Sequence, residues 1–204
     1  MEIPYTHGGD IYSRPIKMDY SANINPLGLP EGVKRELLCC VEENVCCIYP
    51  DSACRSLKMA LSEIHHVPKE WISCGNGAAD LIFALVAALR PRHALLLAPS
   101  FLEYSQALHL WGCETDSFML REDEDFSLDP FRLKEALFRA RAEKQPYDIL
   151  FLCNPNNPTG LPVKKEIVEE IGVVCKETGT WLAVDECFCD FLDEPEAYSA
   201  IPKL

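Results

Sequence analysis

The chain has 204 residues, of which 48% are hydrophobic and 25% are charged, and its formal net charge at pH 7 is −13. This composition is that of a soluble globular protein with one domain or two small ones. The acidic balance excludes the basic surface that nucleic-acid binding requires, and no apolar stretch reaches the roughly 20 residues of a membrane span. We therefore expect neither a nucleic-acid nor a membrane partner.

The eleven cysteines do not form a disulfide framework, because their number is odd and their positions are scattered. The first 15 residues are polar and contain proline, so we expect no signal peptide and a cytoplasmic protein with reduced thiols. Cys39-Cys40 and Cys46-Cys47, with Cys54, are the best candidates for a metal site, but they contain no C-x-x-C unit. We therefore predict no metal.

The first 50 residues are predicted to form an N-terminal arm and a first helix. Asn, Pro and Gly are dense in residues 20–32 (YSANINPLGLPEG), which predicts an extended loop. A helix is expected over 32–45. Residues 51–204 are predicted to form one α/β domain, which opens with an amphipathic helix over 55–66.

From residue 73 onward, segments with helical periodicity alternate with short apolar runs. This alternation predicts parallel βαβ units in a doubly wound sheet, with helices on both faces. Strands covered on both faces are expected to be apolar throughout, as in residues 94–98 (ALLLA). The predicted helices are 80–89, 101–111, 129–144 and 163–179, and the predicted strands are 93–98, 113–120, 148–153 and 180–186.

The strand at 148–153 stops abruptly in the turn NPNNPTG, residues 154–160. Pro155 and Pro158 forbid any continuation of a strand or helix. A stiff turn at the carboxyl end of a buried strand is where open α/β sheets bind their ligands, and Asn157 at its tip can donate a hydrogen bond. The alternative is an ordinary surface turn rich in Asn and Pro.

Two further positions are candidates for ligand contacts. Residues 75–79 (GNGAA) enter a helix, where free N–H groups and the positive end of the helix dipole can hold a phosphate. The segment lacks the lysine of a Walker loop and the G-x-G-x-x-G spacing. Asp185 ends an apolar run and needs a partner, either a structural Arg or the protonated ring nitrogen of a cofactor. With the aromatic Tyr104, these are the groups that pyridoxal phosphate needs.

The motif at 154–160, followed by VDECFCDF at 184–191, resembles the fold-type I superfamily of class I and II aminotransferases. HGGDIY at 7–12 with SANINPLG at 21–28 is similar to the branch of threonine-phosphate decarboxylases, which are related to histidinol-phosphate aminotransferases. The resemblance implies the large domain of a PLP-transferase fold, preceded by an N-terminal arm. It also implies pyridoxal 5'-phosphate as cofactor, a phosphorylated amino acid as substrate and a homodimer.

The resemblance assigns the cofactor contacts by position. The backbone at Gly77, Ala78 and Ala79 would bind the cofactor phosphate. Tyr104 would stack on the pyridine ring, while Asn157 would bond its phenolic oxygen and also lie at the substrate.

The resemblance also assigns contacts to Asp185 and to residues of the N-terminal arm. Asp185 would bond the ring nitrogen, and Tyr49 would reach the cofactor phosphate of the neighbouring subunit. At the substrate the resemblance places His7, Gly8 and Asn23, with the histidine near the substrate phosphate. Phe188 fits the decarboxylase branch too, because many aminotransferases have a tyrosine there.

One departure limits the resemblance. The Schiff-base lysine of the family lies on a later S-x-[ST]-K stretch, and Lys203 comes too early to be this lysine. We therefore expect no catalytic residue in this chain, no C-terminal small domain and no activity for the 204 residues alone. Three functions remain open: a threonine-phosphate decarboxylase of cobalamin biosynthesis, a histidinol-phosphate aminotransferase or other transaminase, and a non-catalytic fragment.

Overall fold

The computed structural model describes residues 8–13 and 15–201. The chain divides into two compact units, residues 1–53 and 54–204, which we call the arm unit and the sheet unit. His7 and Lys203 lie outside the described residues. The division falls three residues from the predicted boundary after residue 50, and the predicted assignment of domains stays a prediction.

The arm unit contains the helix α1 (Glu31–Glu42) and the short 3₁₀ helix η1 (Val45–Cys47). None of the residues in these two helices is buried. The helix predicted over 32–45 ends at Glu42, because Asn44 adopts a left-handed conformation with φ of 57° and interrupts the helical hydrogen bonding.

The sheet unit contains one four-stranded sheet whose order is β2-β1-β3-β4, and every neighbouring pair is parallel. This arrangement confirms the predicted parallel α/β fold. Its elements along the chain are α2 (Arg55–His65), η2 (Lys69–Trp71), α3 (Gly77–Leu89), β1 (His93–Ala98), α4 (Leu102–Leu110), β2 (Glu114–Met119), η3 (Glu122–Glu124), α5 (Pro130–Ala142), β3 (Ile149–Cys153), α6 (Lys165–Thr178), β4 (Trp181–Asp185), η4 (Cys189–Phe191) and η5 (Pro195–Ala197).

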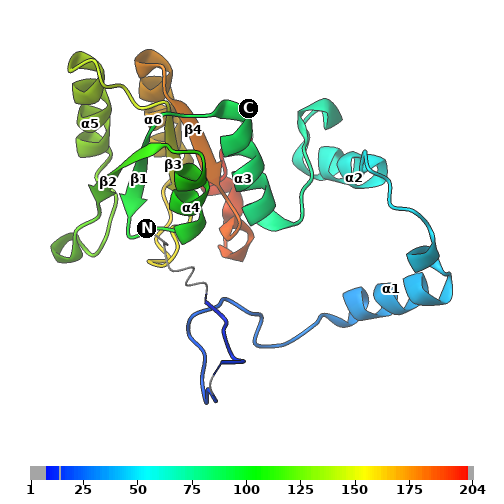
Figure 1. Ribbon diagram of the computed structural model, residues 1–204. Helices are drawn as coiled ribbons and strands as arrows, with labels where there is room; N and C mark the ends of the chain where they lie inside the picture. Colours follow the sequence, from blue (N-terminus) through cyan, green and yellow to red (C-terminus); the bar gives the residue numbers. More distant parts are fainter. Residues whose placement is uncertain (1–7, 14, 202–204) are drawn as a thin grey trace. The chain divides into compact units, whose positions relative to one another are not determined.

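The helices cover both faces of the sheet, because alternate residues of a strand point to opposite faces. On one face α3 and α4 pack against the sheet, and on the other face α5 and α6 do so (Figure 1). The first layer includes Val86, Leu96, Leu108, Ile149 and Phe151. The second includes Leu95, Leu133, Leu150, Leu152 and Ile171.

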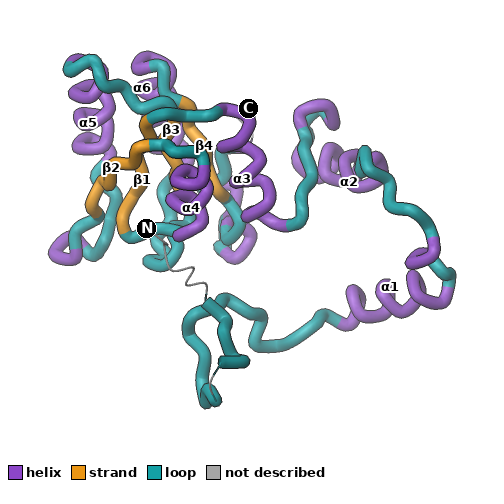
Figure 2. Tube along the Cα trace, viewed as in Figure 1, coloured by secondary structure: helices purple, strands orange, loops and turns teal. Residues whose placement is uncertain are grey.

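The strand order creates a switch point between β1 and β3. After β1 the chain passes through α4 to β2 at one edge, and it then returns past β1 through α5 to β3 (Figure 2). The connection that follows β1 therefore runs to β2, toward one edge of the sheet, and the connection that follows β3 runs to β4, toward the other edge. In open α/β sheets the crevice at the carboxyl ends of such strands binds the ligand.

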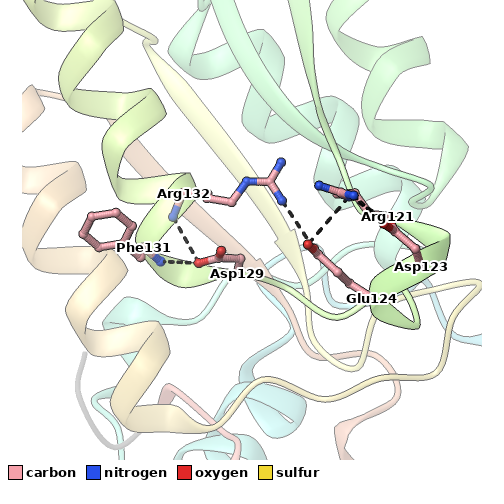
Figure 3. A network of polar contacts seen from close by, with 6 residues as sticks. All are labelled: Arg121, Asp123, Glu124, Asp129, Phe131 and Arg132. Carbon is pink, nitrogen blue, oxygen red and sulfur yellow. Dashed lines mark hydrogen bonds and ion pairs between the residues drawn. The ribbon is translucent and has the colours of Figure 1, made fainter.

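The boundaries of α5 follow from a local polar network. Asp129 is the N-cap, and its Oδ1 accepts hydrogen bonds from the backbone N–H groups of Phe131 at 2.9 Å and Arg132 at 3.1 Å. The guanidinium of Arg132 also meets Glu124 at 3.3 Å, and Glu124 in turn lies 3.6 Å from Arg121 (Figure 3). The Asp129 side chain caps the first N–H groups of α5, and the ion pairs join the connection after β2 to the start of this helix.

Helix α3 begins earlier than its apolar sequence suggests. The predicted helix opens at Asp80, but the observed helix opens at Gly77. The Asp80 carboxylate accepts a hydrogen bond at 2.9 Å from the backbone N–H of Asn76, the N-cap residue. Asp80 therefore belongs to the first turn, where an acid is stabilised by the helix dipole. Across the described residues we find no helix long and apolar enough to cross a membrane.

Candidate functional site

The turn NPNNPTG is built on two asparagines that serve the fold. Asn154 is fully buried, and its Nδ2 donates to the carbonyl oxygens of Val163 at 2.9 Å and Tyr198 at 3.0 Å. Asn156 is 5% exposed, and its Nδ2 donates to the carbonyl oxygen of Pro99, which follows β1, at 3.1 Å. Asn156 therefore joins the turn after β3 to the loop after β1, whereas Asn154 joins it to the segments before α6 and after η5.

Asn157 differs from these two asparagines. Its side-chain amide is partly exposed, and this amide makes no hydrogen bond with any described residue. The amide at the tip of the turn is therefore left without a hydrogen-bond partner among the described residues. The proline-rich string is thus more than a surface turn, because its buried asparagines position the exposed one.

A cavity of about 240 Å³ opens beside the carboxyl end of β4, on the α3 and α4 face of the sheet. Most of its wall is apolar, and Asp185 and Glu186 are the acidic residues that line it. The Glu186 carboxylate accepts hydrogen bonds from Ser199 Oγ and the Ala200 N–H. The lining residues are Ala78, Leu81, Ile82, Leu85, Tyr104, Phe151, Ala183, Val184, Asp185, Glu186 and Cys187. An apolar pocket with a few polar groups has the usual character of a small-molecule site.

Asp185 is the last residue of β4, and it lies partly buried in this cavity. Its Oδ2 accepts a hydrogen bond from the hydroxyl of Tyr104 at 2.6 Å, and its Oδ1 accepts one from the backbone N–H of Cys187 at 3.0 Å. The predicted carboxylate is therefore held by neutral donors. Each of its oxygens has further lone pairs that can accept a donor from a ligand.

Tyr104 comes from the first turn of α4 and is only 1% exposed. Its ring stacks on Phe151 with centroids 4.8 Å apart and an interplanar angle of 13°, and the edge of Phe101 meets it at 5.6 Å. Burial raises the pKa of the Tyr104 hydroxyl far above its ordinary value, and the neighbouring Cys153 and Asp185 raise it further. The hydroxyl therefore remains a hydrogen-bond donor.

The start of α3 has the geometry of an anion site. Gly77 has φ of +84°, a conformation that favours glycine, and the side chain of the N-cap residue Asn76 makes no capping bond. A Cβ on Gly75 would come within 2.9 Å of the Asp80 carboxylate. The first backbone N–H groups of a helix have no intrahelical acceptor, so those of Gly77, Ala78 and Ala79 can hold an anion.

The structure brings some of the predicted cofactor residues together. Ala78, Tyr104 and Asp185 line the same cavity, although they come from three different elements. Gly77 and Ala79 flank Ala78 in the first turn of α3. Asn157 belongs to the turn after β3 and is not among the described residues that line the cavity.

The arm residues are described within their own unit. Gly8 lies against Ser21, so close that a Cβ on Gly8 would come 1.8 Å from the Ser21 carbonyl oxygen, and the N–H of Gly9 donates to Ser21 Oγ at 2.8 Å. The two arm motifs therefore meet. Asn23 is exposed and Tyr49 is 91% exposed, so the predicted substrate and subunit contacts of the arm stay predictions.

Among the cavity residues that sequence reasoning missed, two support the predicted groups directly. Cys187 donates its backbone N–H to Asp185, and Phe151 supports the Tyr104 ring from β3. Phe151 belongs to the apolar run of β3, in which every residue is predicted to be a core residue, so the sequence does not distinguish Phe151 from its neighbours. Cys187 follows Asp185 by two residues, and that proximity was the available signal. Phe188 lies 6.1 Å from Phe191, measured between ring centroids.

Comparisons with known proteins agree with this geometry. The model of the family described as aminotransferase class I and II matches residues 15–204. The chain is 40% identical to a threonine-phosphate decarboxylase from Salmonella typhimurium, over 97% of this chain and 54% of that protein. It is 34% identical to histidinol-phosphate aminotransferase 1 from Carboxydothermus hydrogenoformans, over 89% of this chain and 49% of that protein.

A solved structure shares the fold. It is the histidinol-phosphate aminotransferase from Sinorhizobium meliloti in complex with pyridoxal-5'-phosphate, with a TM-score of 0.76 and 21% identity. The match covers 90% of this chain and 47% of that one. The chain thus spans about half the length of the relatives that it matches.

The family indicates pyridoxal phosphate as the cofactor, and the residues present fit it. The cavity offers an apolar wall for a ring, a carboxylate that can accept a ring N–H, and the N-terminus of α3 for a phosphate. The chain therefore belongs to the family of class I and II aminotransferases, whose cofactor is pyridoxal phosphate.

Proposed function

We propose that this chain is part of a pyridoxal-phosphate enzyme that decarboxylates threonine phosphate, a reaction of cobalamin biosynthesis. The observation that carries the proposal is the 40% identity to a threonine-phosphate decarboxylase over 97% of the chain. The motifs HGGD at 7–10 and SANIN at 21–25 support it, because the described part of the first motif contacts the second through Gly8, Gly9 and Ser21.

Within this proposal, the cofactor supplies an electron sink for the electrons released when CO2 leaves the substrate. Asp185 accepts a hydrogen bond from the ring nitrogen and, because it is negatively charged, favours the protonated ring. The N–H groups at Gly77, Ala78 and Ala79 hold the phosphate, and Asn157 donates its free amide to the phenolic oxygen and lies at the substrate. The apolar wall keeps water from the ring.

The proposed substrate contacts come from the arm. His7, Gly8 and Asn23 are proposed to lie at the substrate, with the histidine against its phosphate group. Tyr49 is proposed to reach the cofactor phosphate of a second subunit, so the proposed assembly is a homodimer, which we place in the cytoplasm.

The proposed activity is that of the full-length protein. The family lysine that binds the cofactor covalently lies on a later S-x-[ST]-K stretch, so we propose that the 204 residues alone are inactive. A non-catalytic piece that only binds the cofactor is the alternative outcome for the 204 residues.

A second candidate is the transamination of histidinol phosphate with 2-oxoglutarate. The observation that favours it is the 34% identity to histidinol-phosphate aminotransferase 1 over 89% of the chain. The two reactions share the cofactor site, and each acts on a phosphorylated substrate. Asp185, Asn157 and the start of α3 therefore have the same proposed roles in both.

The experiment supplies the full-length protein with threonine phosphate in one assay, and with histidinol phosphate and 2-oxoglutarate in another. We expect CO2 from the first assay and no glutamate from the second. Glutamate from the second assay without CO2 from the first would replace the decarboxylase by the aminotransferase. Neither product, from folded protein loaded with pyridoxal phosphate, would overturn both candidates.

A further inference from the structure

The Tyr104 hydroxyl and the Asp185 carboxylate form a pair inside the cavity. The two side chains come from α4 and the end of β4, which are 81 residues apart in the chain, and their oxygens are 2.6 Å apart. We infer that Tyr104 is a positioning residue, whose hydroxyl fixes the Asp185 carboxylate in the orientation that receives the cofactor ring nitrogen. This inference rests on the proposed function of the site.

The ring of Tyr104 is already occupied by contacts within the protein. One face stacks on Phe151 and an edge interaction joins it to Phe101, so that the residue is only 1% exposed. The part of the residue that reaches the functional carboxylate is its hydroxyl. The packing of the ring against β3 therefore determines where the hydroxyl points, as a supporting shell does for a functional group.

The Asp185 carboxylate is held on both oxygens. Tyr104 donates to Oδ2 and the Cys187 N–H donates to Oδ1, so rotation of the carboxylate breaks both bonds. Burial keeps the hydroxyl protonated because it raises the pKa of Tyr104 far above its ordinary value. A hydrogen bond to a charged acceptor is stronger than a neutral one, which suits it to fixing an orientation.

Tyr104 could contribute to cofactor binding in two ways, through its ring or through its hydroxyl. If Tyr104 acts by stacking on the cofactor ring, replacement by phenylalanine preserves the contribution. If it acts through its hydroxyl, the same replacement removes the contribution and does so only while Asp185 is a carboxylate. Tyr104→Phe alone and in combination with Asp185→Asn therefore distinguishes the two roles, as a double-mutant cycle does for residues in contact.

The chain offers a matched control in Tyr147. This residue is 9% exposed, and its hydroxyl donates at 2.8 Å to Asp116, at the opposite end of the same sheet. Tyr147→Phe thus removes the same kind of bond from a similarly buried tyrosine, outside the cavity. It reports the effect of losing one buried tyrosine hydroxyl on the fold alone.

The measurement is the dissociation constant of pyridoxal phosphate from the cofactor-free, full-length protein. We expect Tyr104→Phe to weaken binding by roughly three- to tenfold, since hydrogen bonds to charged groups are among the stronger ones. In the Asp185→Asn background it should add less than about twofold, and Tyr147→Phe alone should stay within about twofold of wild type. Equal weakening in both backgrounds would overturn the inference.

A spectroscopic readout complements the affinity. With nitrogen-15 in the cofactor ring, the nuclear magnetic resonance shift reports whether the bound ring nitrogen is protonated. We expect Tyr104→Phe to move this shift toward that of the unprotonated ring, because a carboxylate that is free to rotate holds the ring proton less well. An unchanged shift in a folded Tyr104→Phe protein contradicts the inference.

A further test keeps Tyr104 in place, so it does not depend on the folding of the Tyr104 variant. With carbon-13 in the tyrosine Cζ atoms, the Tyr104 resonance should move when Asp185 is replaced by asparagine, and the Tyr147 resonance should not. A Tyr104 resonance insensitive to that replacement would overturn the inference. If the wild-type protein binds no cofactor, the proposed function is wrong. If Asp185→Asn weakens cofactor binding but Tyr104→Phe does not, the proposed function stands and only the role of Tyr104 is wrong.

Discussion

The sheet unit and the arm unit differ in how their own residues support the predicted functional groups. In the sheet unit, Tyr104 is packed among core side chains and Asp185 ends a strand of the same sheet. In the arm unit no residue of α1 is buried, and Tyr49 is 91% exposed. The positions of the sheet-unit groups therefore follow from the local core, whereas those of the arm groups do not.

Truncating an apolar side chain in each unit should destabilise the protein only in the sheet unit. Leu150 is fully buried on β3, and Leu37 on α1 is 54% exposed. Leu150→Ala should lower the free energy of unfolding by about 2–5 kcal/mol, because it removes buried contacts and leaves a cavity. Leu37→Ala should change it by less than about 0.5 kcal/mol, as surface substitutions do.

Urea unfolding of the 204-residue chain measures both values. A cost for Leu37→Ala as large as that for Leu150→Ala would contradict the comparison, because it would show that α1 buries its apolar face in this chain. If Leu37→Ala is costly only in the full-length protein, α1 is covered there by groups that do not belong to the arm unit.

The second test removes the charge at the end of β4. In the full-length protein Asp185→Asn should lower turnover by at least about a hundredfold, or about 2.7 kcal/mol, comparable to the loss of other key electrostatic contacts. The amide keeps the shape but not the charge that favours the protonated ring. Steady-state kinetics with threonine phosphate measure the effect.

Asp116→Asn is the matched control for that test, since Asp116 accepts hydrogen bonds from His93 and Tyr147 at the far end of the strands. We expect the turnover of Asp116→Asn to stay within about threefold of wild type, because Asp116 does not line the cavity at Asp185. An Asp185→Asn enzyme that turns over as fast as this control would show that Asp185 is not the ring-nitrogen partner.

The third test concerns the arm, where local structure gives the least support. If His7 meets the substrate phosphate, a charge-assisted hydrogen bond contributes about 1.5–3 kcal/mol, so His7→Ala should lower kcat/KM by roughly ten- to a hundredfold. The loss should be far smaller with unphosphorylated threonine. His65→Ala, an exposed histidine at the end of α2, is the control. Equal losses with both substrates would remove His7 from the phosphate.

The elements of the sheet unit could be predicted from the sequence, because apolar residues recur with helical spacing in its helices and form continuous apolar runs in strands that are buried on both faces. Every predicted strand and helix from residue 80 onward is present, with boundaries shifted by up to three residues. The largest shift is at α3, where the Asp80 carboxylate bonds back to the Asn76 N–H. Such caps depend on side-chain geometry rather than on apolar spacing.

The candidate site was predictable only in part. Asp185 and the glycine-rich start of α3 stand out because polar or small residues interrupt apolar runs there. The hydroxyl of Tyr104 meeting Asp185 was not predictable, because the contact joins residues that are 81 positions apart and depends on Phe151 holding the ring. Nor does the pattern NPNN say which amide is free, since burial of Asn154 and Asn156 follows from tertiary contacts.

If the cavity at Asp185 holds the cofactor, a crystal structure of the full-length protein with pyridoxal phosphate will show it there. We predict the ring nitrogen within hydrogen-bond distance of the Asp185 carboxylate, and the phosphate at the backbone N–H groups of Gly77, Ala78 and Ala79. A cofactor bound elsewhere, or one oriented in this cavity with its ring nitrogen away from Asp185, would contradict the account.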